Sequence, residues 1–430
     1  MTKKELRNAA VAGAQQRPAW IGEPEAGVPS RHTGCSLVLL REDAGRTGPD
    51  ILRNATGLRI AVSSEFQASG VQTPLAAGEG MYFERLGAAL LHGDADQIRA
   101  LESCTAGHTL AVEPERYLRA SARAYSSCLP AAAPAGLSAL HLSGTGMAPA
   151  TWGLQAIGIL SCGFSGCGVR VAILDTGLDL QHPDFAGRPI VSQSFITGAP
   201  IDDRNGHGTH CAGVACGPLH PGDVPRYGIA FGADLYIAKV LDDNADGTYG
   251  NLIAGIDWAI RNGCAVISLS VGAPGILEAS YSQVYERVAA RALAAGSVLI
   301  APAGNESQRP DTVAPVGHPA NCPSILAIGA LDQHLSVAPF SNAGLNPDGG
   351  GVDLAAPGIA VMSAAPGSSL YQLGNGTSTA AGHVSGVAAL LAEAHPRARG
   401  ASLRALLLQT ARPLRAPARD VGAGLVQAPQ

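Results

Sequence analysis

The chain has 430 residues, of which 46% are hydrophobic and 15% are charged; this balance predicts a large buried core and excludes a disordered protein. Its net charge of −5 provides no basic surface for nucleic acid, so we expect no nucleic-acid partner. No apolar run approaches the roughly 18 residues that cross a bilayer, so we expect no membrane span.

The first residues carry no secretion signal that we can identify. Residues 1–33 are polar and contain scattered Pro and Gly, which is typical of a flexible N-terminus. Their basic start, MTKK, is not followed by an apolar stretch long enough for a signal peptide. The sequence therefore predicts a cytoplasmic protein, or a secreted one if the true start lies elsewhere. Nine cysteines include no CxxC pair, so no zinc site is expected, and their disulfide pairing stays open.

Residues 34–120 are predicted to form a small α+β domain. Two apolar runs indicate strands, a third fits either a strand or a helix, and a short amphipathic segment indicates a helix with Asp94 as its N-cap. A last strand is expected to stop at a proline. In chain order these segments are Ser36–Leu40, Leu58–Ser63, Met81–Leu91, Ala95–Glu102 and Thr109–Tyr117.

A linker is predicted to follow. The stretch Leu118–Ala150 is rich in Ala, Pro, Ser and Gly, which indicates an exposed segment that is open to cleavage. We therefore place a linker with a processing site at residues 121–150.

Residues 151–430 alternate between buried strands and helices, and this alternation predicts βαβ units, a parallel sheet and right-handed crossovers. The expected strands are Arg170–Leu174, Leu235–Leu241, Ala265–Leu269, Ser297–Ala301 and Ile325–Ala330. The expected helices are Gly208–Ala215, Asn251–Asn262, Tyr281–Ala295, Ser378–Ala394 and Ser402–Thr410.

Three stretches of this region carry chemically useful side chains. Ser378 stands at the predicted start of a buried helix, where unpaired N–H groups favour a developing anion. Taken alone, it fits an N-cap equally well. Asp175 ends a buried strand, at the edge where α/β folds build their sites, and His207 lies between two glycines. Together these residues supply a nucleophile, a general base and a residue that orients the base.

The blocks around these residues, DTG at Asp175, HGTH at His207 and GTS at Ser378, resemble those of the subtilisin-like serine peptidases. A fourth block, APAGN, ends in Asn305 and resembles the family's oxyanion-hole stretch. The resemblance runs from about Trp152 to Ala428. It implies a parallel sheet with helices on both faces, and a serine endopeptidase that uses the Asp-His-Ser triad and needs no cofactor.

The resemblance also implies a precursor that processes itself. The segment ending in VEPER (residues 112–116) resembles the end of an inhibitor-type prodomain, which implies that residues 34–120 block the cleft of the catalytic domain. The alternative is an unrelated accessory domain. Protein or peptide substrates and the chain's own prodomain are then the expected partners.

Substrate and metal contacts are likewise implied by the resemblance. Two walls of the pocket for the residue before the cut are expected from Ser270, Val271 and Gly272 and from Pro302, Ala303 and Gly304, with Gly317 at the base. No acid is expected there, so we predict broad specificity that favours large apolar residues. Asp184 matches a calcium ligand of the family, with Asp223 as a substitute partner for an Asn that the sequence lacks.

Two other functions were weighed against this prediction. A non-catalytic binding module on the same scaffold would show a broken triad, and the sequence shows none. A lipase-type hydrolase would carry a G-x-S-x-G elbow, whereas Ser378 lies in GTSTA. Cys211 follows His207 by four residues and is expected one helical turn away on the same face, most simply as a small buried side chain.

Overall fold

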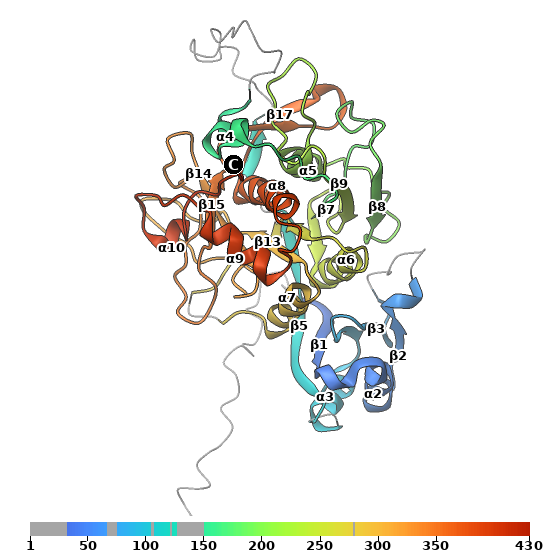
Figure 1. Ribbon diagram of the computed structural model, residues 1–430. Helices are drawn as coiled ribbons and strands as arrows, with labels where there is room; N and C mark the ends of the chain where they lie inside the picture. The colour runs from blue at the N-terminus through green and yellow to red at the C-terminus, as the bar shows by residue number, and fades with distance from the viewer. Residues whose placement is uncertain (1–31, 67–74, 105–106, 121–122, 127–149, 278–279) are drawn as a thin grey trace, which may run out of the picture.

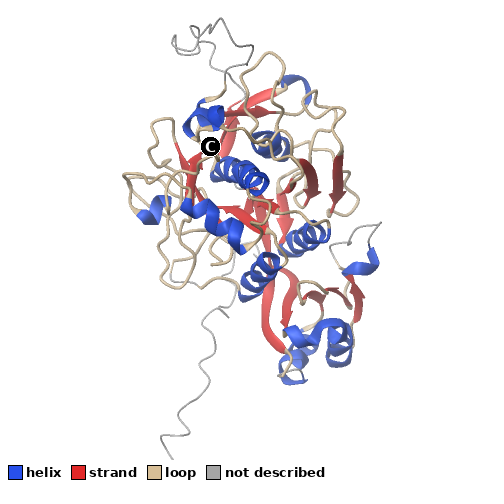
Figure 2. Cartoon of the chain, in the orientation of Figure 1, coloured by secondary structure: helices blue, strands red, loops and turns tan. Residues whose placement is uncertain are grey.

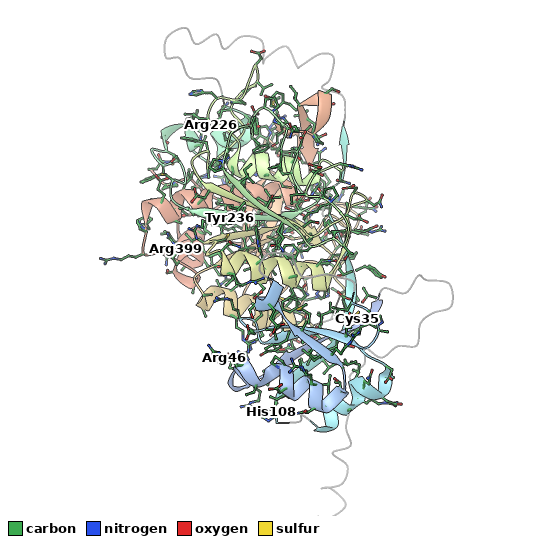
Figure 3. The ribbon with its side chains drawn as sticks, turned by 90° about the vertical axis from the view of Figure 1, so that its right-hand side faces the viewer. Cys35, Arg46, His108, Arg226, Tyr236 and Arg399 are labelled. Carbon is green, nitrogen blue, oxygen red and sulfur yellow. The ribbon has the colours of Figure 1, made fainter. Side chains whose placement is uncertain are left out.

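A computed structural model describes residues 32–66, 75–104, 107–120, 123–126, 150–277 and 280–430 (Figure 1). A larger α/β body contains the residues from 150 onward, and a smaller body contains residues 32–120 (Figure 1). Figure 3 shows Arg226 and Tyr236 in the larger body and Cys35 and His108 in the smaller one. Most of the predicted flexible N-terminus and of the predicted linker lies outside the described residues.

The larger body is built on a parallel sheet of seven strands in the order β15-β14-β13-β11-β7-β9-β8. This confirms the predicted fold class. Apolar side chains alternate between the two faces, and both faces are covered, so the central strands are apolar throughout. The strands are β7 (Arg170–Asp175), β8 (Ile190–Ser194), β9 (Asp234–Lys239), β11 (Val266–Leu269), β13 (Val298–Pro302), β14 (Leu326–Leu331) and β15 (Leu354–Pro357).

Sequence patterns missed the two edge strands of this sheet. No residue of β8 is fully buried and two of its five are exposed, so β8 lacks an apolar run, and β15 is only four residues long. The five predicted strands are confirmed to within two residues at each end.

Helices cover both faces of the sheet (Figure 2). On one face of the sheet, Val171, Ile173 and the side chains of neighbouring strands that point the same way pack against α5 and α8. On the other face, Ala172, Leu174 and the side chains beside them pack against α6 and α7. The helices of the larger body are α4 (Trp152–Ala156), α5 (His207–Cys216), α6 (Tyr249–Arg261), α7 (Gln283–Ala294), α8 (Thr377–Ala394), α9 (Ala401–Gln409) and α10 (Ala418–Val421), with short 3-10 turns at Ile159–Ser161 and Gly367–Ser369. Among the described helices, none combines the length and apolar character needed to cross a membrane.

Helix α8 runs through the centre of the larger body and is buried from Thr377 to Ala392 (Figure 1). Small residues allow this position. A side chain on Gly386 would place its Cβ 2.7 Å from Cβ of Ile229 and 2.8 Å from the carbonyl oxygen of Ala215. The helix that begins at the predicted nucleophile is therefore held tightly along its length.

The smaller body has a sheet in the order β5-β1-β4-β3-β2, with α2 and α3 packed on one face. The segment Met81–Leu91, for which a strand and a helix were both open, forms parts of two antiparallel strands joined by a turn. The elements are β1 (His32–Leu40), α2 (Gly48–Thr56), β2 (Arg59–Val62), β3 (Glu79–Phe83), β4 (Ala88–His92), α3 (Ala95–Cys104) and β5 (Thr109–Ala120), with 3-10 turns at Glu42–Thr47 and Ser63–Phe66. Asp94 caps α3 as predicted, accepting from the N–H groups of Asp96 and Gln97 at 2.9 Å.

Strand β5 differs from the prediction at its end. It continues past Pro114 to Ala120, and a register shift in its pairing with β1 accommodates the proline, which has no N–H to donate. Residues 118–120, whose composition resembles that of the linker, thus belong to a strand. β1 also begins at His32, two residues inside the predicted flexible N-terminus.

A third, small sheet lies beside α5 and carries β6 (Arg123–Ser126), β16 (Val361–Ala364) and β17 (Tyr371–Asn375). β17 pairs with β16 on one side and with β6 on the other. The chain thus forms strands on both sides of residues 121 and 122: β5 ends at Ala120 and β6 begins at Arg123.

Candidate active site

The three predicted site residues meet at the carboxyl edge of the central sheet. Asp175 ends β7, His207 is the first residue of α5, and Ser378 is the second residue of α8. All three side chains are at most 1% exposed. The Nδ1 atom of His207 lies 2.7 Å from Oδ1 of Asp175, and its Nε2 atom lies 3.0 Å from Oγ of Ser378. The three side chains thus form one continuous series of hydrogen bonds, although His207 and Ser378 lie more than 170 positions apart in the sequence.

The charge of His207 is governed by its partner. Burial is the largest single influence and lowers the pKa of the imidazole, but the charge and hydrogen bond of Asp175, together with the neighbouring Cys211, raise it, so the net pKa lies well above its ordinary value. This arrangement stabilises the imidazolium that forms when His207 accepts a proton from Ser378.

A buried carboxylate ties the first two members of the triad together. Oδ1 of Asp203 accepts from Oγ1 of Thr176 at 2.9 Å, and its Oδ2 accepts from N of Thr209 at 2.8 Å. Thr176 in turn accepts from N of Gly208 at 2.9 Å. The turn after Asp175 is thereby joined to the first turn of the helix that carries His207. Motif spacing had not identified Asp203.

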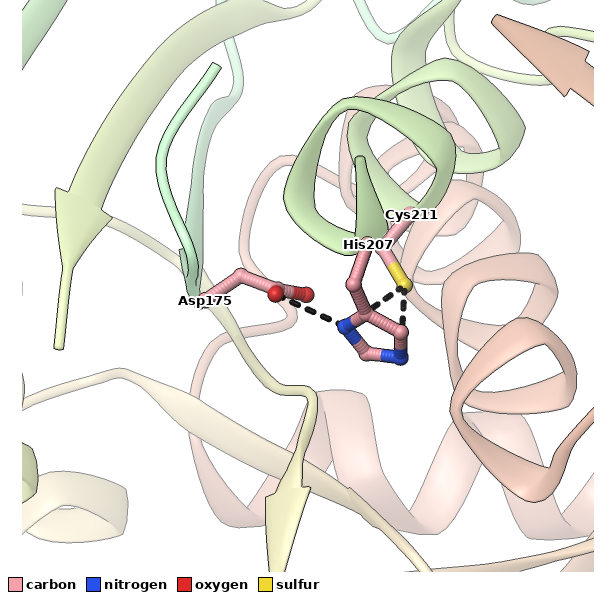
Figure 4. A group of neighbouring side chains, drawn as sticks. All are labelled: Asp175, His207 and Cys211. Atoms are coloured by element: carbon pink, nitrogen blue, oxygen red, sulfur yellow. Dashed lines mark hydrogen bonds and ion pairs between the residues drawn. The ribbon is translucent and has the colours of Figure 1, made fainter. Parts of the chain in front are cut away.

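Cys211 lies beside the imidazole, as its spacing predicted (Figure 4). Its Sγ atom is 4.0 Å from Nδ1 and 3.9 Å from Nε2 of His207. Asp175, His207 and Cys211 form the one group of potential metal-binding side chains found in the described part of the chain. Because the sulfur atom is nearly equidistant from the two ring nitrogens, it lies off the lone-pair direction of each. The thiol and the imidazole are therefore not arranged to share a metal ion. Burial raises the pKa of the thiol, which keeps it in the neutral form.

Asn305 lies next to the nucleophile. Its Oδ1 atom accepts from N and Oγ1 of Thr377, both at 2.9 Å. These two bonds fix the orientation of the amide. Gly304, with φ of 111°, makes the turn before it, and a Cβ there would lie 2.3 Å from Nδ2 of Asn342. Only glycine suits this position.

A cavity of about 230 Å³ adjoins Asn305. Of the predicted walls, Gly272, Pro302, Gly304 and Gly317 line it, and Ser270, Val271 and Ala303 do not. The remaining lining residues, which sequence reasoning missed, are Arg119, Ala120, Ala273, Pro274, Glu306 and His318.

Two of the missed residues matter for charge. Glu306 follows Asn305 directly and is exposed, with its Oε2 accepting from Nδ2 of Asn342 at 2.5 Å. The expectation of a pocket without an acid therefore overlooked a carboxylate at its rim. His318 is 4% exposed, and burial together with the nearby Arg116 lowers its pKa to about 4.

The other histidines of the motif blocks bond to backbone carbonyl groups and so hold the local backbone. His182 bonds to O of Leu370, His210 to O of Val361 and His383 to O of Thr379. Burial lowers the pKa of His210 to about 3 and that of His383 to about 4, so both rings stay neutral.

Asp184, the predicted calcium ligand, accepts hydrogen bonds from two tyrosines. The hydroxyl of Tyr227 lies 2.5 Å from Oδ2, and that of Tyr371 lies 3.4 Å from Oδ1. Calcium takes six or more oxygen ligands, and Tyr227 would have to give way for an ion to use Oδ2. The calcium site therefore remains a prediction, with the tyrosine hydroxyls as competitors for the carboxylate.

The end of β5 forms a strand beside the cavity of about 230 Å³, which Arg119 and Ala120 line. It pairs antiparallel with β10 (Asp246–Thr248) on one side and with β12 (Val271–Gly272) on the other. Leu118 is 1% exposed and packs in the core cluster that contains Tyr249 and Val271.

Two glutamates of β5 bond to helix N-termini of the larger body. Glu113 accepts from N of Gln283 at 2.7 Å, where α7 begins. Glu115 accepts from N of Gly250 at 2.7 Å, in the first turn of α6. Carboxylates at these ends satisfy unpaired N–H groups and the helix dipole, so they bind the smaller body to the larger one.

Comparison of the sequence with known proteins finds similarity to peptidases. The model of the Subtilase family matches residues 166–424. Subtilisin E of Bacillus subtilis (strain 168) is 38% identical over 260 residues, which is 60% of this chain and 64% of that protein. Subtilisin of Bacillus pumilus is 38% identical over 260 residues, 60% of this chain and 89% of the relative. Subtilisin Savinase of Lederbergia lenta is 37% identical over 281 residues, 64% of this chain and 96% of the relative.

Proposed function

Because this chain belongs to the subtilase family, we propose that it is a serine endopeptidase whose catalytic residues are Asp175, His207 and Ser378. The observation that carries the proposal is the pair of hydrogen bonds made by His207, one to Asp175 and one to Ser378. A non-catalytic module would have no use for this complete and buried arrangement.

The chemistry follows from the positions of these groups. Oγ of Ser378 attacks the peptide carbonyl while Nε2 of His207 takes its proton and later returns it to the leaving amine. Nδ2 of Asn305 and the N–H of Ser378 donate to the oxyanion; losing one such donor costs about 3–4 kcal/mol of transition-state stabilisation. Water then hydrolyses the acyl-enzyme, and no cofactor is required.

Active-site labelling tests this function. A fluorophosphonate should label wild-type protein at Ser378 and should stop cleavage of casein, whereas Ser378→Ala should neither be labelled nor cleave. A folded, processed wild-type protein without turnover at neutral or mildly alkaline pH would refute the proposal.

The pocket supports broad specificity with a preference for large apolar residues before the cut. Its volume accommodates such a side chain, and its lining is largely glycine, alanine and proline. Glu306 at the rim additionally favours a long basic side chain. Anilide peptides ending in Phe, Leu and Lys should all be cut, and Glu306→Gln should lower only the rate for Lys.

We further propose that the protein is a self-processed zymogen, in which residues 34–120 act as an intramolecular inhibitor. Support comes from β5, whose end fills the edge-strand positions that a peptide substrate would use, and from β6, which pairs with β17 just before Ser378. The cut then falls at one of the three peptide bonds between Ala120 and Arg123, within or beside the linker predicted at residues 121–150.

Processing has a direct readout. Wild-type protein of 43.5 kDa should split into two chains, and N-terminal sequencing of the larger should begin at Ser121, Ala122 or Arg123. Ser378→Ala should stay at full length. Equal processing of this variant, purified without other proteases, would show that another enzyme makes the cut.

A further inference from the structure

Arg119 holds a defined position in the cleft. It lies on β5 opposite Asp246 of β10 on one side and Gly272 of β12 on the other. The pairing uses backbone groups on both edges, so any extended peptide bound between β10 and β12 places one residue at this position. A side chain on β10 or β12 can therefore contact one particular residue of the bound peptide and select for its type.

The side chain of Arg119 meets an acid there. Its Nε atom lies 2.6 Å from Oδ1 of Asp246. Asp246 itself is held by a turn, because its N–H donates to Oδ1 of Asp242 at 3.0 Å and its carbonyl accepts from N of Asp242 at 2.8 Å. The backbone that carries this carboxylate is thus held in place beside β5.

A second acid lines the same cavity as Arg119. Glu306 and Arg119 both line the cavity next to Asn305. Among the residues of β5 that pair with β10 and β12, Tyr117 to Ala120, the charged side chain is that of Arg119, and its charge is opposite to that of Asp246 and Glu306. Complementary charges of this kind favour one class of partner over another.

From these contacts we infer that Asp246 is a specificity residue, selecting a basic side chain at the position of Arg119, two to four residues before the bond that is cut. This inference rests on the proposed peptidase function. The pair is exposed, with 80% of the Arg119 side chain and 41% of the Asp246 side chain accessible, so the preference is modest. Exposed ion pairs of this type correspond to about a two- to fivefold effect, weakened by salt.

Paired peptides test the inference. Each pair should differ only in Arg or Gln, placed one, two or three residues before a Phe that directly precedes the cut. Processed wild-type enzyme should favour Arg by about two- to fivefold in kcat/KM in one of the three pairs, and less so in 1 M salt. Asp246→Asn should remove the preference by slowing only the Arg peptide.

The control is Asp234→Asn, an exposed acid at the start of β9, which should keep the wild-type preference. Charge reversal sharpens the result, since Asp246→Lys should favour Glu at the same peptide position. Equal rates for Arg and Gln in wild type, or a preference that survives in Asp246→Asn, would overturn the inference while leaving the peptidase function intact. An enzyme that cuts none of the peptides would instead refute the proposed function.

Discussion

At the scale of single residues, the triad depends on how Asp175 and Asp203 divide their roles. Asp175 contacts the imidazole and sets its charge, whereas Asp203 has no contact with the reacting atoms. Asp203 acts through Thr176 and Thr209 and keeps the strand end and the helix start at a fixed separation. Local motifs reveal the first kind of residue, because it is part of a short signature, but not the second.

Replacing the carboxylate of Asp175 should change both the rate and the pH profile. In Asp175→Asn the amide offers no charge to stabilise the imidazolium, and kcat should fall by about 10⁴. The wild-type enzyme should lose activity as the pH falls through the raised pKa of His207. Without the carboxylate that pKa decreases, so the acidic limb of the profile should move to lower pH. An unchanged acidic limb would contradict the assigned cause.

Cys211 should make the enzyme sensitive to mercurials. A bulky group on Sγ would push on the imidazole, which lies within 4.0 Å. We expect inhibition of wild type and of Cys167→Ala, whose thiol is exposed, but none of Cys211→Ala. The reaction should be faster at alkaline pH, because burial raises the pKa of the Cys211 thiol and only the thiolate reacts. Inhibition that persists in Cys211→Ala would implicate another thiol.

At the scale of elements, the tyrosines at Asp184 join three separate segments. Asp184 follows β7, Tyr227 precedes β9, and Tyr371 begins β17, which leads to the nucleophile. The rings of Tyr227 and Tyr371 also pack edge to face, with centroids 6.0 Å apart. Burial and the neighbouring Asp184 raise the pKa of Tyr227, so its hydroxyl remains a donor across the working pH range.

Removing the hydroxyl of Tyr227 should show how much its hydrogen bond to Asp184 stabilises the fold. Tyr227→Phe should lower the free energy of unfolding by about 1.5–3 kcal/mol, the range for a hydrogen bond to a charged group. Tyr236→Phe on β9 is the matched control, because no hydrogen bond of its hydroxyl is found within the described residues. Since calcium would compete with Tyr227 for Asp184, added calcium should raise the melting temperature of Tyr227→Phe more than that of wild type. Equal responses to calcium would argue against an ion at Asp184.

The sequence predicted the parallel sheet, its main helices and the triad because each rests on a local pattern. Apolar runs mark buried strands wherever they pair, and DTG, HGTH and GTS mark strand ends and helix starts. The end of β5 could not be predicted in this way. Residues 118–120 look like a linker by composition, and their strand conformation comes from pairing with β10 and β12, more than 120 positions away. Glu306 could not be predicted as a residue of the cavity lining, because the turn at Gly304 determines where its carboxylate lies.

At the scale of the whole molecule, two bodies are held together by charged and apolar contacts. Beyond the glutamates on β5, Oγ of Ser63 donates to Oδ2 of Asp257 at 3.0 Å, and Nη2 of Arg291 donates to O of Leu40 at 3.3 Å. Leu37 and Leu90 pack in the same core cluster as Tyr249 and Tyr285. Association therefore has an apolar centre with polar contacts around it.

The helix-capping glutamates should govern how tightly the smaller body inhibits. Glu113→Gln and Glu115→Gln each remove a negative charge from a helix N-terminus, and each should weaken inhibition of processed enzyme by about fivefold, from about 1 kcal/mol per contact. Glu79→Gln, at an ion pair with Arg59 inside the smaller body, serves as the control and should inhibit as wild type does. Inhibition constants measured on processed protein test this directly; unchanged constants for both variants would show that the apolar centre alone holds the complex.

One continuous strand, β5, runs from the sheet of the smaller body to the proposed cut, and this has a consequence for when the enzyme becomes active. While the chain is intact, the occupant of the cleft is tethered, and its effective concentration does not depend on how much protein is present. Once one of the peptide bonds between Ala120 and Arg123 is cut, the smaller body is a separate chain. It must then bind the cleft at its concentration in solution. The activity per molecule of the processed protein should then rise on simple dilution, because the cut smaller body dissociates at low protein concentration.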